Sequence, residues 1–490
     1  MRAAAGSSLS NHRRSTTLIE LLLNDVLART NTHPGTVALD LIRREFGLKG
    51  TKAGCREGDC GACTVLLGQF EGDRLRYRAV PSCLLPVGEL HGKHVVTIEG
   101  LTGEGFTPVQ QAMVDEGATQ CGFCTPGFII SITGFLLASP TLSLDDARAA
   151  IEGNICRCTG YISIVRAVER VLDRTGESLP RAEDHVPGDR TRELVRTGVL
   201  PALFLEAPDR LRRVASSPPG PRDGGILVAG GTDLFVQRPE DLRHSELSFL
   251  SRRSDLTGVR ADDDTVAIGA ATPVEDLRCD ATLRDLLPGW DDALTLVSSG
   301  LVRNRATVGG NIVNASPIAD LTIMLLALDA TLMLSRGGET NRLPLRSFYR
   351  GYKELDLKDG EIVAAIEFPR PAPGARFHFE KVSRRGHLDI AGVNSAAVIE
   401  AEKDVVRRAS ISAGGVDCVP LHLTKTSERL EGATLSPELV EEVARLAVSE
   451  TSPITDVRGS AEYRRRLLRR LIIAHFVELF PSLELEALIA

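Results

Sequence analysis

The chain has 490 residues, of which 43% are hydrophobic and 25% are charged, and its formal net charge is −7. This length exceeds what one hydrophobic core usually supports, so we expect several domains. No apolar run approaches the ~18 residues that a membrane span needs, and the acidic balance without a long Lys/Arg run argues against a nucleic-acid-binding surface. We therefore expect neither a membrane nor a nucleic acid as partner.

The first fifteen residues are basic, small and polar, and Arg13-Arg14 precede an apolar stretch, as in a twin-arginine export signal. That stretch, 18–27, contains Glu20 and Asp25, whereas the core of a signal peptide is uncharged. We therefore expect residues 1–16 to be a disordered tail and the protein to be cytoplasmic.

Residues 17–99 are predicted to form short strands around one helix, which Thr36 caps and Gly47 ends. Residues 100–175 are predicted to be helical. Capping patterns begin at Thr107, Thr125 and Ser143, and an apolar stripe over 162–168 marks a fourth helix.

Residues 176–195 are polar, charged and Pro-containing, which is typical of a linker. The next stretch, 196–372, has mixed α+β character and contains two Gly-rich turns, at 228–235 and 307–311, each after an apolar run. Residues 376–490 read as a separate α+β unit in which strands give way to two helices.

Ten cysteines are present, and eight of them lie between positions 55 and 158. In a reducing compartment such clustering indicates metal binding rather than disulfides. Cys279 and Cys418 stand far from the others, and we expect them to pack as small hydrophobic residues.

The first four of the clustered cysteines have the spacing Cys55-x4-Cys60-x2-Cys63, followed by Cys83. This spacing is typical of a plant-type [2Fe-2S] site. The loop of these ligands also holds Gly54, Gly58, Gly61 and Ala62, whose small size would let backbone N–H groups approach the cluster sulfurs and tune the reduction potential.

The second set comprises Cys121-x2-Cys124 and Cys156-x-Cys158, each at a junction between predicted helices. The four thiolates would converge if those helices pack, which predicts a second [2Fe-2S] site. A four-cysteine zinc site remains the alternative for either set, although zinc usually takes two short pairs of another spacing.

Long motifs surround these cysteines. They are Gly54-Cys55-Arg56-Glu57-Gly58-Asp59-Cys60-Gly61-Ala62-Cys63-Thr64-Val65, Gln120-Cys121-Gly122-Phe123-Cys124-Thr125-Pro126-Gly127 and Gly153-Asn154-Ile155-Cys156-Arg157-Cys158-Thr159-Gly160-Tyr161. The motifs closely resemble those of the xanthine oxidase/dehydrogenase family of molybdenum hydroxylases. The resemblance continues through 228–235, 307–320 and 381–385, so it covers nearly everything after residue 17.

The resemblance implies an α+β multidomain protein with a β-grasp ferredoxin-like domain and a four-helix [2Fe-2S] bundle, then a linker, a PCMH-type, non-Rossmann FAD domain and a C-terminal α+β flavoprotein domain like that of CO dehydrogenase. The corresponding ranges are 17–99, 100–175, 176–195, 196–372 and 376–490. The implied metal ligands are Cys55, Cys60, Cys63, Cys83, Cys121, Cys124, Cys156 and Cys158.

Neither Gly-rich turn is a G-x-G-x-x-G motif leading a Rossmann helix, but consecutive amides without Cβ obstruction could form an anion nest for a pyrophosphate. By resemblance, the residues that contact FAD are Val228, Ala229, Gly230, Gly231, Thr232, Asp233, Leu234, Phe235, Val297, Thr307, Val308, Gly309, Gly310, Asn311, Asp320, Val363 and Lys381.

Resemblance also places Tyr352 beside the flavin where a nicotinamide approaches, although an ordinary packed tyrosine is equally compatible with the sequence. Two positions depart from the family pattern. Val297 stands where some relatives carry an aromatic residue, and Gly386-His387-Leu388 replaces a run of acidic residues. These departures leave the NAD side of the site open.

The function that the resemblance implies is electron transfer from a partner subunit, which oxidises hypoxanthine or xanthine at molybdenum, through two [2Fe-2S] clusters and FAD to NAD. We expect no catalytic residue for the molybdenum step here, because no segment remains to house molybdopterin. A molybdopterin-binding large subunit in an α2β2 heterotetramer is therefore implied.

Two alternatives stay open. The chain could serve another molybdenum hydroxylase acting on aldehydes, CO or aromatic-CoA substrates. Those enzymes commonly keep iron-sulfur and flavin domains on separate chains, so their fusion here favours xanthine dehydrogenase. The other alternative is a zinc-stabilised binding module without a redox role.

Overall fold

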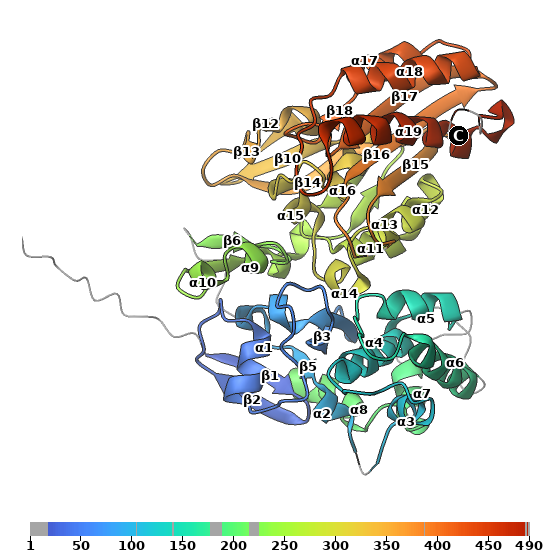
Figure 1. Cartoon of the computed structure of the whole chain (residues 1–490). Helices are drawn as coiled ribbons and strands as arrows, with labels where there is room; N and C mark the ends of the chain where they lie inside the picture. The colour runs from blue at the N-terminus through green and yellow to red at the C-terminus, as the bar shows by residue number, and fades with distance from the viewer. Residues whose placement is uncertain are drawn as a thin grey trace, which may run out of the picture.

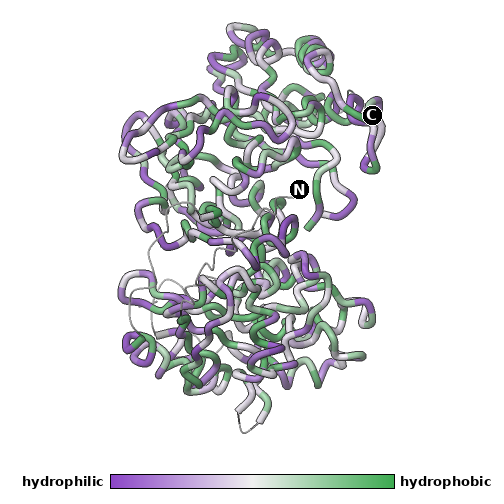
Figure 2. The backbone as a smooth tube through the Cα atoms, turned by 90° about the vertical axis from the view of Figure 1, so that its left-hand side faces the viewer, coloured by the Kyte–Doolittle hydropathy of each residue, from purple (hydrophilic) through white to green (hydrophobic). Residues whose placement is uncertain are grey.

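The computed structural model describes residues 18–103, 105–139, 142–176, 189–214, 225–386, 388–485 and 488. The expected N-terminal tail and most of the expected linker lie outside these residues. In Figure 1 the N-terminal domains form a lower part and the later domains an upper part. Figure 2, at right angles, shows the same two parts, with hydrophilic stretches mainly on their outer turns. The protein is an α+β multidomain chain, as the sequence predicts.

The first domain is a five-stranded sheet of order β2-β1-β5-β3-β4, in which β1 and β5 run parallel. Its strands are β1 (Ile19–Leu23), β2 (Val26–Thr30), β3 (Thr64–Glu71), β4 (Arg74–Pro81) and β5 (His94–Val96). Ile19, Leu21 and Leu23 enter one core because successive residues of a strand face opposite sides. This is the predicted β-grasp fold.

The helix of this domain begins one residue later than predicted. α1 (Ala38–Asp40) continues as a π-helical turn, Leu41–Glu45, and its N-cap is Val37, which offers no side-chain oxygen. The expectation that Thr36 caps the helix is therefore wrong. Gly47 follows the helix with a φ of +71°, which agrees with its predicted role at the end.

The second domain is helical. Its helices are α2 (Ile98–Leu101), α3 (Pro108–Asp115), α4 (Thr125–Ala138), α5 (Leu144–Ile151) and α6 (Ile162–Gly176). Thr107 and Ser143 cap α3 and α5 as predicted. Thr125 instead is the first residue of α4, whose N-cap is Cys124 without a side-chain cap, so that predicted cap is wrong by one position. The cap falls on Cys124, which ties the start of α4 to the second cysteine set.

Helices α7 (Asp189–Arg196) and α8 (Leu203–Leu211) follow and pack on this lower part. Leu194 and Phe204 join the core of the helical domain, and Ala207 and Leu211 cover Leu22 of β1. Part of the segment expected to be a linker is therefore helical and packed.

The upper part begins with two parallel strands, β6 (Ile226–Val228) and β7 (Leu247–Phe249). A five-stranded sheet of order β11-β10-β14-β9-β8 and the hairpin β12-β13 follow. The remaining strands are β8 (Val259–Ala261), β9 (Thr265–Gly269), β10 (Thr331–Arg336), β11 (Glu339–Pro344), β12 (Tyr349–Gly351), β13 (Glu354–Leu355) and β14 (Ile362–Pro369). The helices are α9 (Leu234–Gln237), α10 (Pro239–Leu242), α11 (Val274–Cys279), α12 (Ala281–Leu286), α13 (Trp290–Thr295), α14 (Gly300–Arg303), α15 (Val308–Val313) and α16 (Asp320–Ala327).

The C-terminal domain is an antiparallel sheet of order β15-β16-β17-β18 packed against three helices. These elements are β15 (Arg376–Val382), β16 (Val393–Glu402), β17 (Val405–Gly414), β18 (Leu421–His422), α17 (Thr424–Leu430), α18 (Pro437–Ser449) and α19 (Ala461–Leu479). Within the described ranges, no helix combines the length and apolar character that crossing a bilayer requires.

Candidate functional site

The first four cysteines lie as two pairs, in the loop before β3 and the turn after β4. The thiols of Cys55 and Cys60 are within hydrogen-bonding reach of each other, and so are those of Cys63 and Cys83. Cys63 and Cys83 are each 3% exposed, whereas Cys55 is exposed to solvent. One pair is therefore buried and the other lies toward the surface.

Backbone amides surround these sulfurs. The amides of Glu57 and Cys60 donate to Cys55 Sγ over 3.3 and 3.4 Å, and the amide of Gly58 donates to Cys83. The hydrogen bond from the Cys60 thiol and those from the amides lower the pKa of Cys55 to about 5, although burial opposes the shift. A lower thiol pKa favours the thiolate, which is the form that binds iron.

The second four cysteines form two pairs as well. Cys121 and Cys158 are exposed, with 3.5 Å between their sulfurs, and Cys124 and Cys156 are within hydrogen-bonding reach. Burial alone would raise the pKa of Cys156, but hydrogen bonds with the hydroxyl and amide of Thr159 lower it. The arrangement repeats that of the first set.

The two cysteine loops are joined by direct hydrogen bonds. The amide of Ile155 donates to the carbonyl of Cys60 over 3.0 Å, and Asn154 Nδ2 donates to the carbonyl of Gly61 over 3.1 Å. A Cβ on Gly61 would lie 2.4 Å from the Gly153 carbonyl oxygen, so this position has no room for a side chain. One bonded path thus leads from Cys60 through Ile155 to Cys156.

The sulfur arrangement fits iron-sulfur clusters. In the part of the chain that the structure describes, no three His, Cys, Asp or Glu side chains surround one point as a single metal ion requires. The sulfurs of each set lie instead as two pairs. Two pairs suit a [2Fe-2S] cluster, in which each of two irons takes two thiolates, whereas structural zinc holds four ligands around one ion.

The buried pair of the first set belongs to an apolar cluster shared by two domains. Cys63 and Cys83 pack in it with Leu84 of the ferredoxin-like domain and with Val228 and Phe235 of the first Gly-rich turn. Protein atoms therefore fill the space between this cysteine pair and the predicted FAD segment, which excludes water from the interface.

The first Gly-rich turn joins β6 to α9. Gly231 has a φ of +75°, which glycine adopts without strain. Among the described residues, the backbone amides of Gly230, Gly231, Thr232 and Asp233 donate to no protein group. Unpaired consecutive amides at such a turn could bind a pyrophosphate oxygen.

The second Gly-rich turn begins α15, and its amides, unlike those of the first turn, donate to protein groups. The amides of Val308 and Gly309 donate to the carbonyls of Thr272 and Ala270 over 3.2 and 2.8 Å, and the amide of Gly310 donates to Thr307 Oγ1 over 3.2 Å. The expectation of an amide nest is therefore wrong for this turn. Its glycines serve packing instead, since a Cβ on Gly309 would lie 2.8 Å from the Ala270 side chain.

Two predicted FAD residues from different domains meet in a polar network. Lys381 Nζ donates to Asp320 Oδ2 and to the Leu296 carbonyl, both over 2.8 Å, and Asn394 Nδ2 donates to Asp320 Oδ1 over 2.5 Å. Burial raises the pKa of Asp320 despite the Lys381 charge. A cavity of about 310 Å³ lies beside this network, lined by Leu296 and residues 380–386, and this volume is at the lower end of ligand pockets.

The remaining residues predicted to lie at the flavin or the nicotinamide are found outside this polar network. Val297 and Val363 are buried in the main core of the FAD domain. Tyr352 is 64% exposed on the β12-β13 hairpin, next to Lys353, which donates to the Asn314 carbonyl. The exposure of Tyr352 contradicts its reading as an ordinary packed residue.

Three further positions from the sequence analysis have different outcomes. His387, in the departure at 386–388, lies outside the described residues. Cys279 and Cys418 are both exposed, so the expectation that they pack as small hydrophobic residues is wrong.

Several residues that shape the sites are not among those predicted from the sequence. Asn154 was part of a quoted motif, but its bond to the first cysteine loop spans 93 positions of sequence. Asn394 holds Asp320 from β16, and Arg305 donates to the Gly230 carbonyl over 2.8 Å. The available sequence signal for Arg305 was its place just before the second Gly-rich turn. Its burial, which reveals its structural role, is a property of the folded chain.

Family models match the chain in four consecutive stretches. Residues 23–88 match the 2Fe-2S iron-sulfur cluster binding domain and residues 97–169 the [2Fe-2S] binding domain. Residues 215–371 match the FAD binding domain in molybdopterin dehydrogenase, and residues 377–479 match the CO dehydrogenase flavoprotein C-terminal domain. The chain therefore contains two [2Fe-2S] domains and an FAD domain.

Curated relatives align over most of the chain. The xanthine dehydrogenase/oxidase of Mus musculus is 29% identical, covering 92% of this chain and 38% of its own length. Aldehyde oxidase 1 of Macaca fascicularis is 27% identical, covering 93% of this chain and 39% of its own. A solved chain of Cu,Mo-CO dehydrogenase is 28% identical over 51% of this chain and 88% of its own, with a TM-score of 0.48. The chain spans about two fifths of the length of these curated relatives.

Proposed function

We propose that this chain is the iron-sulfur and FAD part of a molybdenum hydroxylase, that it carries electrons from a molybdenum partner to a soluble acceptor, and that the enzyme is a xanthine dehydrogenase. Two [2Fe-2S] clusters and FAD are the proposed carriers. The acceptor proposed is NAD, and the partner is a molybdopterin-binding large subunit in an α2β2 assembly.

The observation that carries this proposal is the spatial order of the sites. The second cysteine set has an exposed pair, its loop bonds directly to the first cysteine loop, and the buried pair of the first set packs against the first Gly-rich turn. Electron carriers held at these positions would form one line from the surface to the flavin domain. Each link is made by protein atoms rather than by solvent.

We propose that all eight clustered cysteines are the iron ligands. For FAD, the amides at 230–233, which donate to no group among the described residues, would bind the pyrophosphate, while Asp320 and Lys381 would border the ring system beside the 310 Å³ cavity. When bound, the clusters supply one-electron transfer and FAD supplies the two-electron exchange. The protein contributes by holding these groups in place, donating amides to sulfur and excluding water.

The choice of xanthine dehydrogenase rests on relatives named for that activity. Fusion of the iron-sulfur and flavin domains does not separate it from aldehyde oxidase, because aldehyde oxidase 1 also aligns with 93% of this chain. Domain fusion therefore does not favour purines over aldehydes as substrates. Assaying the native complex with hypoxanthine, xanthine and aldehydes tests the choice; turnover of aldehydes without purines would overturn it.

We expect residues 1–490, loaded with clusters and FAD but without a partner, to oxidise NADH with an artificial dye and to leave xanthine unchanged. Hydride exchange with NADH requires the flavin side near Lys381, which belongs to this chain. The purine reaction requires molybdenum on the partner. Dye reduction and urate formation, followed by absorbance, measure the two activities.

Failure of the flavin-replete chain to reduce dye from NADH would indicate a different acceptor. Turnover of xanthine by this chain alone would contradict the assignment of the molybdenum site to a partner.

A further prediction concerns the surface around the second cysteine set. Phe123, Tyr161 and Ile162 are 45%, 40% and 70% exposed beside Cys121 and Cys158. We propose that this apolar rim contacts the molybdenum partner. Ile162→Asp should lower substrate-driven NAD reduction by at least about tenfold, because a charge at the centre of an interface costs several kcal/mol. Turnover of the reconstituted complex at limiting partner concentration is the measurement.

Ile454→Asp is the matched control, since Ile454 is 67% exposed on the C-terminal domain. NADH-dye activity should be the same in both variants. Equal losses of substrate-driven turnover in the two variants would contradict the assignment of this surface.

A further inference from the structure

A fully buried ion pair joins the ferredoxin-like domain to the FAD domain. Arg305 lies between α14 and α15, and its NH1 group donates to Glu89 Oε2 over 2.9 Å. The side chains of Arg305 and Glu89 are 6% and 1% exposed. Such a pair carries a large desolvation cost, and removing one partner would leave the other charge buried and unpaired.

A second residue of the FAD domain, Ser251, also hydrogen-bonds to the Glu89 carboxylate. Ser251 Oγ donates to Glu89 Oε1 over 3.0 Å. Burial alone would raise the pKa of Glu89, but the charges of Arg305 and Lys93 and the hydrogen bonds lower it. The carboxylate therefore stays ionised inside the interface and keeps the Arg305 guanidinium in one orientation.

The other end of that guanidinium reaches the first Gly-rich turn. Arg305 NH2 donates to the carbonyl of Gly230 over 2.8 Å. A Cβ on Gly230 would lie 2.1 Å from the Arg305 carbonyl oxygen, so the backbone of Arg305 also lies directly against this glycine. Gly230 is thus held both by the side chain and by the main chain of Arg305.

The contact between Arg305 and Gly230 lies at the turn that is proposed to bind the pyrophosphate of FAD. Gly230 begins the run of four residues whose amides have no protein partner within the described chain, and Gly231 follows with its φ of +75°. The Gly230 carbonyl and the Gly231 N–H belong to one planar peptide group, so a fixed direction of the carbonyl also fixes the direction of this N–H. The orientation of the Gly231 amide, one of the proposed pyrophosphate-binding amides, is therefore linked through Arg305 to Glu89 in another domain.

We propose that Arg305 is a positioning residue for FAD, and that its pair with Glu89 makes flavin affinity depend on the docked ferredoxin-like domain. This inference rests on the proposed placement of FAD at residues 228–235. The coupling is reciprocal, because a turn that binds flavin better when docked also docks better when flavin is bound.

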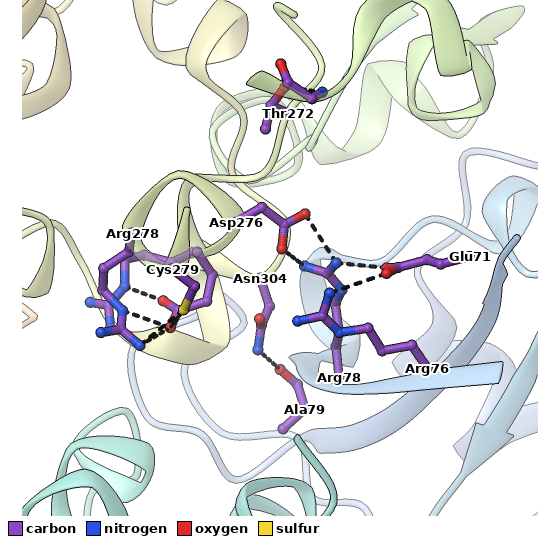
Figure 3. Close-up of polar contacts among 12 residues, drawn as sticks. Glu71, Arg76, Arg78, Ala79, Thr272, Asp276, Arg278, Cys279 and Asn304 are labelled. Carbon is purple, nitrogen blue, oxygen red and sulfur yellow. Dashed lines mark hydrogen bonds and ion pairs between the residues drawn. The ribbon is translucent and has the colours of Figure 1, made fainter. Parts of the chain in front are cut away.

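A matched control is available in the same interface. Arg78 of β4 donates to Asp276 of α11 over 2.6 and 3.0 Å, and Asn304 donates to the Ala79 carbonyl over 2.9 Å (Figure 3). The Arg78–Asp276 pair ties the same two domains together, but neither residue contacts the first Gly-rich turn. Asp276→Asn therefore weakens docking without touching the turn.

The test compares Glu89→Gln with Asp276→Asn in the full chain, with iron content verified. Flavin is removed and FAD is titrated back while the quenching of its fluorescence is followed. Glu89→Gln should raise the Kd for FAD at least about tenfold, whereas Asp276→Asn should change it less than about twofold. Arg305→Lys keeps the charge but loses the planar fork that reaches Gly230, so it should raise the Kd as well.

Thermal unfolding of the flavin-free proteins supplies the second readout. An equal Kd for both variants, or an increase that follows the loss of melting temperature equally in both, would overturn the inference. If Glu89→Gln fails to fold, Arg305→Lys decides, and an unchanged Kd in that variant would overturn it. Failure of the FAD placement itself is distinguishable, because Gly231→Val would then keep full flavin affinity.

Discussion

Replacing Cys60 or Cys124 by serine is expected to remove one cluster and to leave the other in place. The two cysteines belong to sets in different domains, Cys60 in the loop before β3 and Cys124 at the N-cap of α4. Serine is a poor iron ligand compared with a thiolate, and each [2Fe-2S] site holds the same number of irons. Iron per chain should therefore fall by about half in either variant, and in the double variant iron should be lost.

Iron and sulfide analysis, together with electron paramagnetic resonance of the reduced protein, measures this result, because each single variant should retain the signal of one cluster. Cys279→Ser is the control, since Cys279 is exposed and outside both sets. Loss of both clusters from a single variant that remains folded would contradict the ligand assignment. Unchanged iron in both would contradict it as well.

Gly231→Val is expected to lower the affinity for FAD by at least about tenfold. A β-branched residue at a φ of +75° is strained by roughly 1–3 kcal/mol. Its Cβ would also lie 3.1 Å from the Phe235 ring and 3.3 Å from the Val228 side chain, so these two side chains would have to shift by a few tenths of an ångström. Iron content should not change. FAD titration of the flavin-free protein measures the effect.

Gly432→Val is the matched control. Gly432 has the same φ of +75° and open space around its Cβ position, but it lies in the C-terminal domain. The backbone strain should therefore be similar in the two variants, whereas the flavin should stay bound in the control. Full flavin affinity in Gly231→Val would contradict the placement of FAD at the first turn.

Local patterns predicted much of this fold, because capping, turns and strand alternation depend on neighbouring residues. The capping box at Thr107 and the cap at Ser143 form as expected, and α18 and α19 follow the strands of the C-terminal domain as predicted. The predicted caps at Thr36 and Thr125 failed by one residue each. In both cases another contact lies at the start of the helix. At α1 it is a β-bridge between Val37 and Pro86, and at α4 it is the cysteine turn that ends at Cys124.

The second Gly-rich turn shows why a local pattern can mislead. Its glycines are as numerous as those of the first, so the two turns look alike in sequence. The carbonyls of Ala270 and Thr272 occupy the amides of the second turn, and they come from the segment after β9, more than thirty residues earlier in the chain. Availability of an amide depends on such distant acceptors, which a local pattern does not contain.

The sequence by itself determined the chemistry of this protein. The spacing of eight cysteines and the motifs around them indicated two [2Fe-2S] sites, because ligand type and short-range spacing are properties of the chain. The tertiary structure decided how those sites connect. The pairing of sulfurs, the bond from Ile155 to Cys60, and the buried link from Glu89 through Arg305 to Gly230 join residues up to 216 positions apart. Such contacts form where separately folded cores pack together, because burial and hydrogen-bond partners are set there by the whole chain.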